Sequence, residues 1–183
     1  MVTKTRMTAA EYRQLPETTQ PTELIEGEII VSPAPKDSHQ AVVMGFVQAI
    51  LRQLAAGTLR FAPLDVYLDD ETVVQPDVFW VSGPGSRCRL GDDGCWYGAP
   101  DLVIEVLSPG TARRDKAVKF RLYEQHGVRE YWLADPDARY VEVWRRADDA
   151  SRFEQQGVYG PDETFESALL GQAVALAPVF PQA

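Results

Sequence analysis

The sequence predicts an α/β fold of the α+β kind, in which helices pack over a mixed central β-sheet. The run DLVIEVL (101–107) is apolar at nearly every position except its acids, which is typical of a strand buried on both faces. Amphipathic segments at 38–56 and 111–126 have the apolar spacing of helices and can cover those faces. A chain of 183 residues can close its own core, so residues 1–183 are predicted to form a single domain.

The N-terminal elements are predicted from the residues at their boundaries. Thr8 and Glu11 have the spacing of a capping box, which marks the start of a short first helix. Residues 23–32 have the pattern of a β-hairpin. Asp37 or Ser38 is expected to cap the long helix that follows.

The other strands are predicted from short apolar runs between turn residues. These runs lie at 59–68, 72–81, 101–107, 129–135 and 140–146, and a last one begins at residue 153. Gly127 marks the end of the helix at 111–126. Tyr131 and Trp132 are expected to pack in the core, with a subunit interface as the alternative role for such aromatic pairs.

Composition and charge limit the classes of function. The net charge of −9 argues against broad, charge-driven binding of nucleic acid. The only dense basic segment is RRDKAVKFR (113–121). Alternatively, this segment is the solvated face of a helix. No apolar run is long enough to cross a bilayer and no secretory signal is recognisable, so a cytoplasmic protein without membrane contact is expected. Cys88 and Cys95 are expected to be free thiols because the ligand spacing of a zinc site is lacking.

Two carboxylates stand in strongly apolar runs. Glu105 lies within VIEVL, and Asp77 follows Pro76 within VVQPDVFWV. A carboxylate buried alone is costly, so each must be protonated, paired with a base or bound to a cation. One alternative is an ordinary ion pair at a strand end, with Arg113 or Arg114 as the partner.

A lysine in the following helix can complete this acid pair. Lys119 is four residues from both Asp115 and Tyr123, which places the three side chains on one helical face. Lys116 is the second candidate, and a surface pair between Asp115 and Lys119 is the alternative. Two acids that hold a divalent cation, with a lysine beside them, are the minimal equipment for metal-dependent phosphodiester hydrolysis.

Several stretches of the chain resemble the Uma-two family of restriction endonuclease-like proteins, a branch of the PD-(D/E)XK nuclease superfamily. They are ELIEGEI, SPAPKDSHQ, VQPDVFWV, APDLVIEVLSPGT and DKAVKFRLYEQHGVREYWLAD, and they span residues 23–135 in the order found in the family. The resemblance implies a restriction-endonuclease-like core, a mixed central β-sheet flanked by helices.

The resemblance also implies roles for individual residues. Asp77 matches the acid of the "PD" element and Glu105 the acid of the "(D/E)XK" element, but Leu107 stands where the superfamily has its lysine. Lys119 matches a lysine that this family carries in the next helix. Glu23 and His39 match recurring positions near the metal site, although His39 as a helix-cap residue is an equal alternative.

The implied activity is that of a metal-dependent endonuclease that cleaves DNA. Asp77, Glu105 and the carbonyl of Val106 would bind Mg²⁺ or Mn²⁺. Lys119 would orient the attacking water or neutralise the developing charge, and Glu23 would extend the site to a second ion. The basic residues Arg113, Arg114 and Lys116 would contact neighbouring phosphates.

Two other functions fit the same residues. One is a nuclease-like module that binds nucleic acid or a protein partner without cutting, which the negative charge and the displaced lysine favour. The other is a hydrolase that acts on a small phosphoester. Superfamily nucleases often pair to cut two strands, so a homodimer is expected by analogy.

Overall fold

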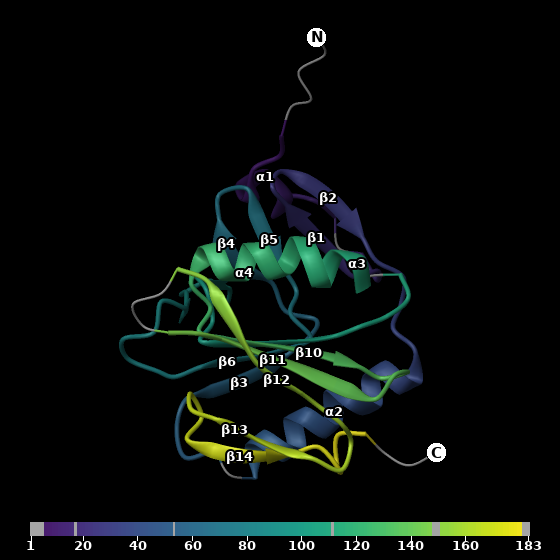
Figure 1. The fold of residues 1–183 in the computed structure, drawn as a ribbon. Helices are drawn as coiled ribbons and strands as arrows, with labels where there is room; N and C mark the ends of the chain where they lie inside the picture. Colours follow the sequence, from purple (N-terminus) through teal and green to yellow (C-terminus); the bar gives the residue numbers. More distant parts are fainter. Residues whose placement is uncertain (1–5, 17, 53, 111, 148–150, 181–183) are drawn as a thin grey trace.

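The computed structural model describes residues 6–16, 18–52, 54–110, 112–147 and 151–180. Its central sheet has six strands in the order β12-β11-β10-β9-β6-β3 (Figure 1), of which only β9 and β10 run parallel to each other. The bounds of these strands are β3 Thr58–Phe61, β6 Val78–Val81, β9 Leu102–Val106, β10 Glu130–Asp135, β11 Tyr140–Arg146 and β12 Phe153–Tyr159. The predicted mixed sheet is therefore confirmed.

A second sheet of six strands lies over one part of the central sheet. Its order is β2-β1-β5-β4-β8-β7, with β4 and β8 parallel and the other pairs antiparallel. The strands are β1 Thr22–Ile25, β2 Glu28–Val31, β4 Val66–Asp69, β5 Thr72–Val74, β7 Arg89–Leu90 and β8 Trp96–Tyr97. A separate hairpin, β13 (Thr164–Ser167) with β14 (Gln172–Ala175), was not predicted and closes the C-terminal part.

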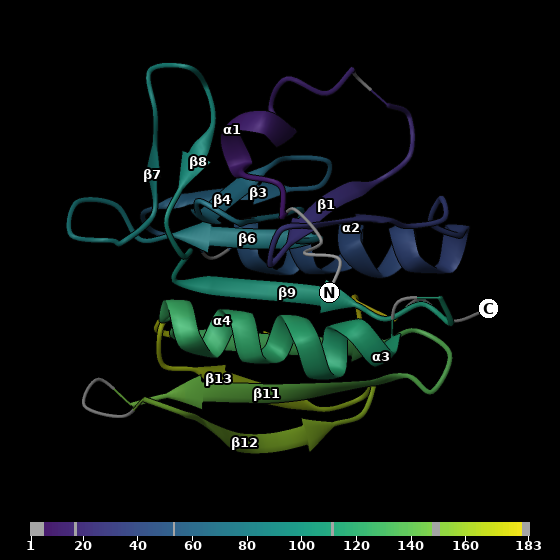
Figure 2. The same ribbon diagram turned by 90° about the horizontal axis from the view of Figure 1, so that it is seen from above.

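Helices cover both faces of the central sheet, as the sequence predicts. Helix α2 (Asp37–Leu51) packs on one face together with the β13–β14 hairpin. On the other face, α3 (Ala112–Arg114), a π-helical turn η1 (Asp115–Lys119) and α4 (Phe120–His126) form one continuous rod. Figures 1 and 2 show this rod running alongside β9, between the central sheet and the second sheet. None of the helices in the described ranges combines the length and apolar character needed to cross a lipid bilayer.

The alternation of side chains along β9 decides where the functional acid points. Leu102, Ile104 and Val106 belong to the core under α2, whereas Val103 and Leu107 belong to the core under α4 and the second sheet. Glu105 has the same parity as Val103, so its carboxylate is directed toward α4. Both faces of the strand are buried, as the apolar run predicts.

Two of the predicted strands are wrong in their extent. The run 59–68 divides into β3 and β4, and the run 72–81 divides into β5 and β6, with each half in a different sheet. Pro63 and Pro76 lie at the two breaks, where their missing N–H groups end the strand ladders. Asp77 therefore lies in the crossing between the two sheets and not inside a strand.

The helix boundaries are confirmed in part. The capping box of α1 (Ala9–Tyr12) is present, because Thr8 and Glu11 satisfy each other's backbone N–H groups. Helix α2 has Lys36 as its N-cap residue, so neither Asp37 nor Ser38 caps it, and it ends at Leu51 instead of extending to 56. Asp37 instead occupies the first turn, where its negative charge interacts favourably with the helix dipole.

The predicted hairpin is confirmed as β1–β2. The predicted helix stop is also confirmed, because Gly127 directly follows α4 and has the left-handed backbone of a helix C-cap. Thr111, the predicted start of that helix, lies outside the described residues. Tyr131 and Trp132 are fully buried in the core, as expected.

Gly45 allows the C-terminal segment to lie directly on α2, and its replacement tests this packing. A Cβ atom at Gly45 would lie 2.6 Å from the Cα atom of Val179 and 3.0 Å from the carbonyl oxygen of Pro178. Alanine favours a helix over glycine by about 1 kcal/mol, yet the backbone clash should outweigh this gain. We expect Gly45→Ala to lower the free energy of unfolding by roughly 1–3 kcal/mol in urea titrations.

The neighbouring Met44, which is 50% exposed, supplies the matched control. Met44→Ala should change the free energy of unfolding by less than about 0.5 kcal/mol. A Gly45→Ala protein more stable than the parent would show that the segment does not rest on this helix.

Both cysteines are free, as expected, and their different burial predicts different reactivity. Burial raises the pKa of the Cys88 thiol to about 12, and Cys95 is only partly buried. The reactive thiolate form of Cys88 is therefore scarce near neutral pH. Iodoacetamide should therefore alkylate Cys95 well before Cys88 in the folded protein and both alike in denaturant, as followed by mass spectrometry. Equal rates in the folded state would contradict the described burial.

Candidate active site

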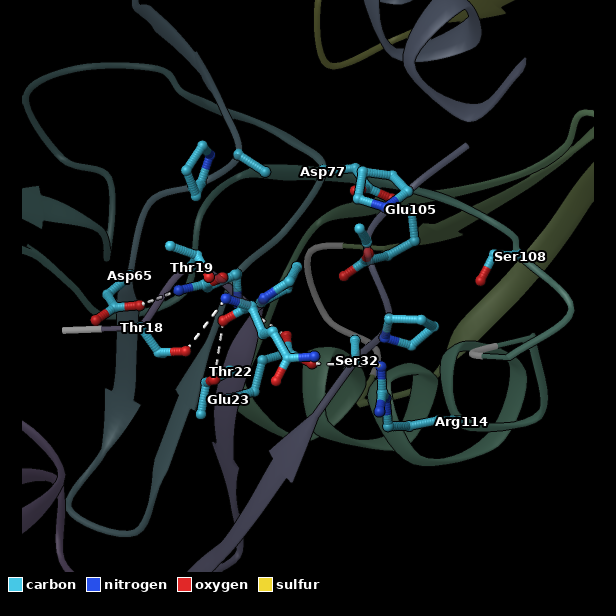
Figure 3. A pocket seen from close by; sticks show the side chains of 18 of the residues that line it. Thr18, Thr19, Thr22, Glu23, Ser32, Asp65, Asp77, Glu105, Ser108 and Arg114 are labelled. Atoms are coloured by element: carbon cyan, nitrogen blue, oxygen red, sulfur yellow. Dashed lines mark hydrogen bonds and ion pairs between the residues drawn. The ribbon is translucent and has the colours of Figure 1, made fainter. Parts of the chain in front are cut away.

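A single cavity of about 910 Å³ lies where the two sheets and the α3–α4 rod meet. Three acids reach it from three different parts of the fold: Glu23 from β1, Asp77 from the crossing before β6, and Glu105 from β9. Figure 3 shows Glu105 and Ser108 toward one end of the cavity and Asp65 and Thr18 toward the other. The topology thus brings together the acids that the sequence singles out.

Lys119 is the cation at the centre of these acids. Its Nζ atom lies 2.8 Å from Glu23 Oε1 and 2.9 Å from Glu105 Oε1. Asp115 Oδ1 lies 3.9 Å away, and the lysine is 3% exposed. The alternative of a surface pair between Asp115 and Lys119 is therefore wrong. Burial lowers the pKa of Lys119, but the negative charges of Glu105, Glu23 and Asp115 raise it by more than burial lowers it. The net shift of the pKa is upward, so the amine stays charged.

The π-helical turn brings a second group from the rod onto Glu105. The hydroxyl of Tyr123 donates to Glu105 Oε1 over 2.6 Å, on the same oxygen that Lys119 contacts. Asp115, Lys119 and Tyr123 thus converge as their four-residue spacing predicts. Turns of this widened kind are rare and occur frequently at functional sites.

The surroundings of Glu105 shift the pKa of its carboxyl group. Burial raises its pKa well above the ordinary value, and Lys119 lowers it. The charges of Asp77, Asp115 and Glu23 raise it again, and the upward shift prevails. An acid held this way in a cavity is typical of a functional site.

Asp77 is held by the strand that carries Glu105. Its Oδ2 atom accepts a hydrogen bond of 2.7 Å from the backbone N–H of Val106. The same oxygen lies 3.2 Å from Nε2 of His39, which is in the first turn of α2 and does not cap it. Burial lowers the pKa of His39, but the hydrogen bond and charge of Asp77 and a backbone hydrogen bond to Val106 raise it above the ordinary value. The cap alternative for His39 is therefore wrong.

Glu23 links the cluster to two residues that sequence reasoning missed. Its Oε1 atom accepts a hydrogen bond of 2.8 Å from the backbone N–H of Gln75, and the Gln75 side-chain amide donates to Asp65 Oδ1 over 2.8 Å. The signal available in the sequence was the polar Gln75 in the otherwise apolar run before Pro76-Asp77. Asp65 gave no local signal, because only the pairing of β4 with β5 brings it there.

The three basic residues predicted to contact phosphates do not lie together. Arg114 lines the cavity, where its Nη2 atom donates to Ser32 Oγ over 2.7 Å and lies 3.7 Å from Glu23 Oε2. Lys116 instead contacts the hydroxyl of Tyr140 and the carboxylate of Glu142, away from the cavity lining. The side chain of Arg113 lies outside the described residues. The phosphate-binding role of all three stays a prediction.

The charge balance of the cavity fits a bound cation. Five carboxylates line it, those of Glu23, Asp65, Asp77, Glu105 and Asp115. Three permanent cations face them, Arg13, Arg114 and Lys119, and His39, whose pKa is raised, is a fourth group that can carry positive charge. The carboxyl groups outnumber these cations, so the site favours a positive ligand over an anionic one.

The predicted metal ligands provide only a few donor groups for a metal ion. Within the described ranges, no group of three or more His, Cys, Asp or Glu side chains is arranged to hold a metal ion. Asp77 and Glu105, with the backbone of Val106 beside them, form a smaller set. Asp77 Oδ1 and Glu105 Oε2 take no part in the contacts described above. Magnesium is commonly bound by one or two carboxylates, with water and substrate phosphate completing its shell.

Known proteins are similar to this chain over most of its length. The model of the Uma2 family, described as "Putative restriction endonuclease", matches residues 9–178. A crystal structure described as "a putative nuclease belonging to DUF820" from Anabaena variabilis superposes with a TM-score of 0.76 at 26% identity, over 95% of this chain and 97% of that one. The uncharacterized protein slr1290 of Synechocystis sp. is 25% identical over 69% of this chain and 67% of its own length. The uncharacterized protein sll1609 of the same organism is 28% identical over 78% of this chain and 82% of its own length.

The buried position of Lys119 predicts a large effect of its removal on stability. Lys119→Met would leave Glu23 and Glu105 without their common cation, and we expect a loss of about 3–5 kcal/mol in the free energy of unfolding. Lys116→Met is the matched control three residues away, where an exposed pair with Glu142 should cost less than about 1 kcal/mol. Urea titrations of both variants measure the difference, and equal losses would contradict the buried cluster.

Proposed function

The chain belongs to the Uma2 family, and from this premise we propose that it is a metal-dependent endonuclease that hydrolyses phosphodiester bonds of DNA. The observation that carries the proposal is the convergence of Asp77, Glu105 and Lys119 on one cavity, with Lys119 delivered from the helix. Leu107 occupies the position of the strand lysine and is buried in the core, and the lysine that contacts Glu105 comes from the helical rod instead. The superposed protein, described as a "putative nuclease", supports the same class of reaction.

The metal proposed for the site is Mg²⁺ or Mn²⁺. Asp77 and Glu105 would hold it, together with the carbonyl of Val106. When bound, such an ion supplies a Lewis acid for the phosphate and lowers the pKa of a water molecule. The acid excess of the cavity supports a divalent cation over a neutral ligand.

The chain's own residues would position the substrate and balance its charge. The ammonium of Lys119 has three N–H donors, and its short contacts with Glu23 and Glu105 use two of them. The third is available to an attacking water or to a phosphate oxygen in the cavity. Tyr123 and Glu23 restrain Glu105 and Lys119, and His39 restrains Asp77, so the groups need little reorganisation.

A second candidate is a nuclease-fold module that binds nucleic acid or a protein partner without cutting. The net charge of −9 and the sparse donor set favour it. Calorimetric titration with magnesium separates the two functions, since a module without catalysis needs no ion. As part of the endonuclease proposal, two copies of the chain would form a homodimer that cuts the two DNA strands.

Nicking of supercoiled plasmid tests the endonuclease directly. We expect nicking with Mg²⁺ or Mn²⁺, none with EDTA, and a loss of about 100-fold or more in Asp77→Asn and Glu105→Gln, because both lose a charged ligand but keep their shape. Glu154→Gln, an exposed position on β12, should cleave like the parent. Circular dichroism of each variant shows whether the fold is kept. Cleavage in EDTA, or undiminished cleavage in both site variants, would contradict the proposal.

A further inference from the structure

The cavity extends well beyond the acids that the proposed reaction uses. Its volume of about 910 Å³ is within the range of pockets that enclose small ligands, roughly 300–1,000 Å³. Asp65 lies toward the end of the cavity away from Glu105 (Figure 3), and Gln75, Tyr12 and Tyr67 also line the cavity. The side chains around Asp65 indicate the chemistry of a ligand that would fit there.

Asp65 and Gln75 form a fixed pair of polar groups in this part of the cavity. The Gln75 side chain is held by Asp65, and its backbone N–H is held by Glu23, so the residue is restrained at both ends. Within the described part of the chain, Asp65 has this one hydrogen bond and no ion pair, and burial raises its pKa. A partly buried carboxylate with a single partner is costly unless a ligand donates to it. A carboxylate beside an amide presents the acceptors and donors that the edge of a nucleobase pairs with.

An aromatic platform stands beside this pair. The guanidinium of Arg13 lies 4.9 Å from the ring centre of Tyr67, and the rings of Tyr67 and Tyr97 stack at 5.2 Å. Asp93 anchors Arg13 with an ion pair of 2.7 Å. Arg13 and Tyr67 both line the cavity. Aromatic rings and arginine planes are the surfaces on which unpaired bases stack.

The charges of the site disfavour binding to the phosphate backbone of a continuous duplex. Binding to duplex phosphates depends on free lysine and arginine side chains. Here Lys119 and Arg114 are engaged with Glu23, and Lys116 is engaged with Glu142. Within the cavity, affinity for nucleic acid would therefore come mainly from stacking, from pairing with a base edge and from the bound ion.

From these observations we propose that the cavity encloses one unpaired nucleotide, with its base between the Arg13–Tyr67 platform and the Asp65–Gln75 pair and its phosphate at the acid centre. The substrate class is then DNA with a single-stranded or frayed segment. This inference rests on the proposed function for its chemistry. Its binding component is independent of cutting and is tested separately.

Fluorescence anisotropy with a labelled single-stranded oligonucleotide and the matching blunt duplex, in a calcium buffer, tests the binding. We expect the single strand to bind more tightly than the duplex. Asp65→Asn should weaken single-strand binding by about 5- to 150-fold, as expected for the loss of a base-edge contact. Asp92→Asn, at an exposed position outside the cavity lining, should bind like the parent. The heat of Mn²⁺ binding should be unchanged in Asp65→Asn, which shows that the acid centre is intact.

The outcomes separate this inference from the proposed function. Tighter binding of the duplex, or an Asp65→Asn protein that binds the single strand like the parent, would overturn the nucleotide pocket even if plasmid is nicked. Single-strand binding that depends on Asp65, without any cleavage, would support the pocket and overturn the endonuclease. No binding of either oligonucleotide would overturn the pocket.

Discussion

The contact of one buried ammonium with two buried carboxylates is the interaction on which the rest of the site depends. Lys119 comes from the helical rod, Glu23 from the second sheet and Glu105 from the central sheet, so this contact joins three layers of the fold. Each charge would be costly alone in this setting, and removal of Lys119 would leave both carboxylates without their common cation. The same contact therefore holds the layers together and positions the groups of the site.

A second buried acid shows what a purely structural network looks like in this fold. Glu130 is 1% exposed and accepts hydrogen bonds from Trp132, Arg145, Ser167 and the backbone of Leu169, which fasten the β13–β14 hairpin to the central sheet. One carboxylate there meets one arginine and three neutral donors. The cavity cluster has more carboxyl groups than permanent cations instead, and a bound cation would balance this difference.

The parts of the site that were predicted from sequence either have a local signal or, as with Glu23 and His39, match the resemblance to the family. An acid within an apolar strand identified Glu105, and the four-residue helical spacing identified Lys119. The pairing of the two sheets has no such signal, so the breaks at Pro63 and Pro76 and the meeting of Asp65 with Gln75 were missed. The direction of Lys116 was missed for a related reason, since only the placement of β11 provides its partners Tyr140 and Glu142.

We propose that Asp77 and Glu105, completed by a lysine from the helical rod, form one metal-binding centre. Anomalous scattering from crystals soaked in Mn²⁺ tests it most directly. The account predicts an ion bound between the carboxylates of Asp77 and Glu105, with Lys119 still in contact with Glu105. An ion bound elsewhere, or crystals in which neither carboxylate binds manganese, would contradict it.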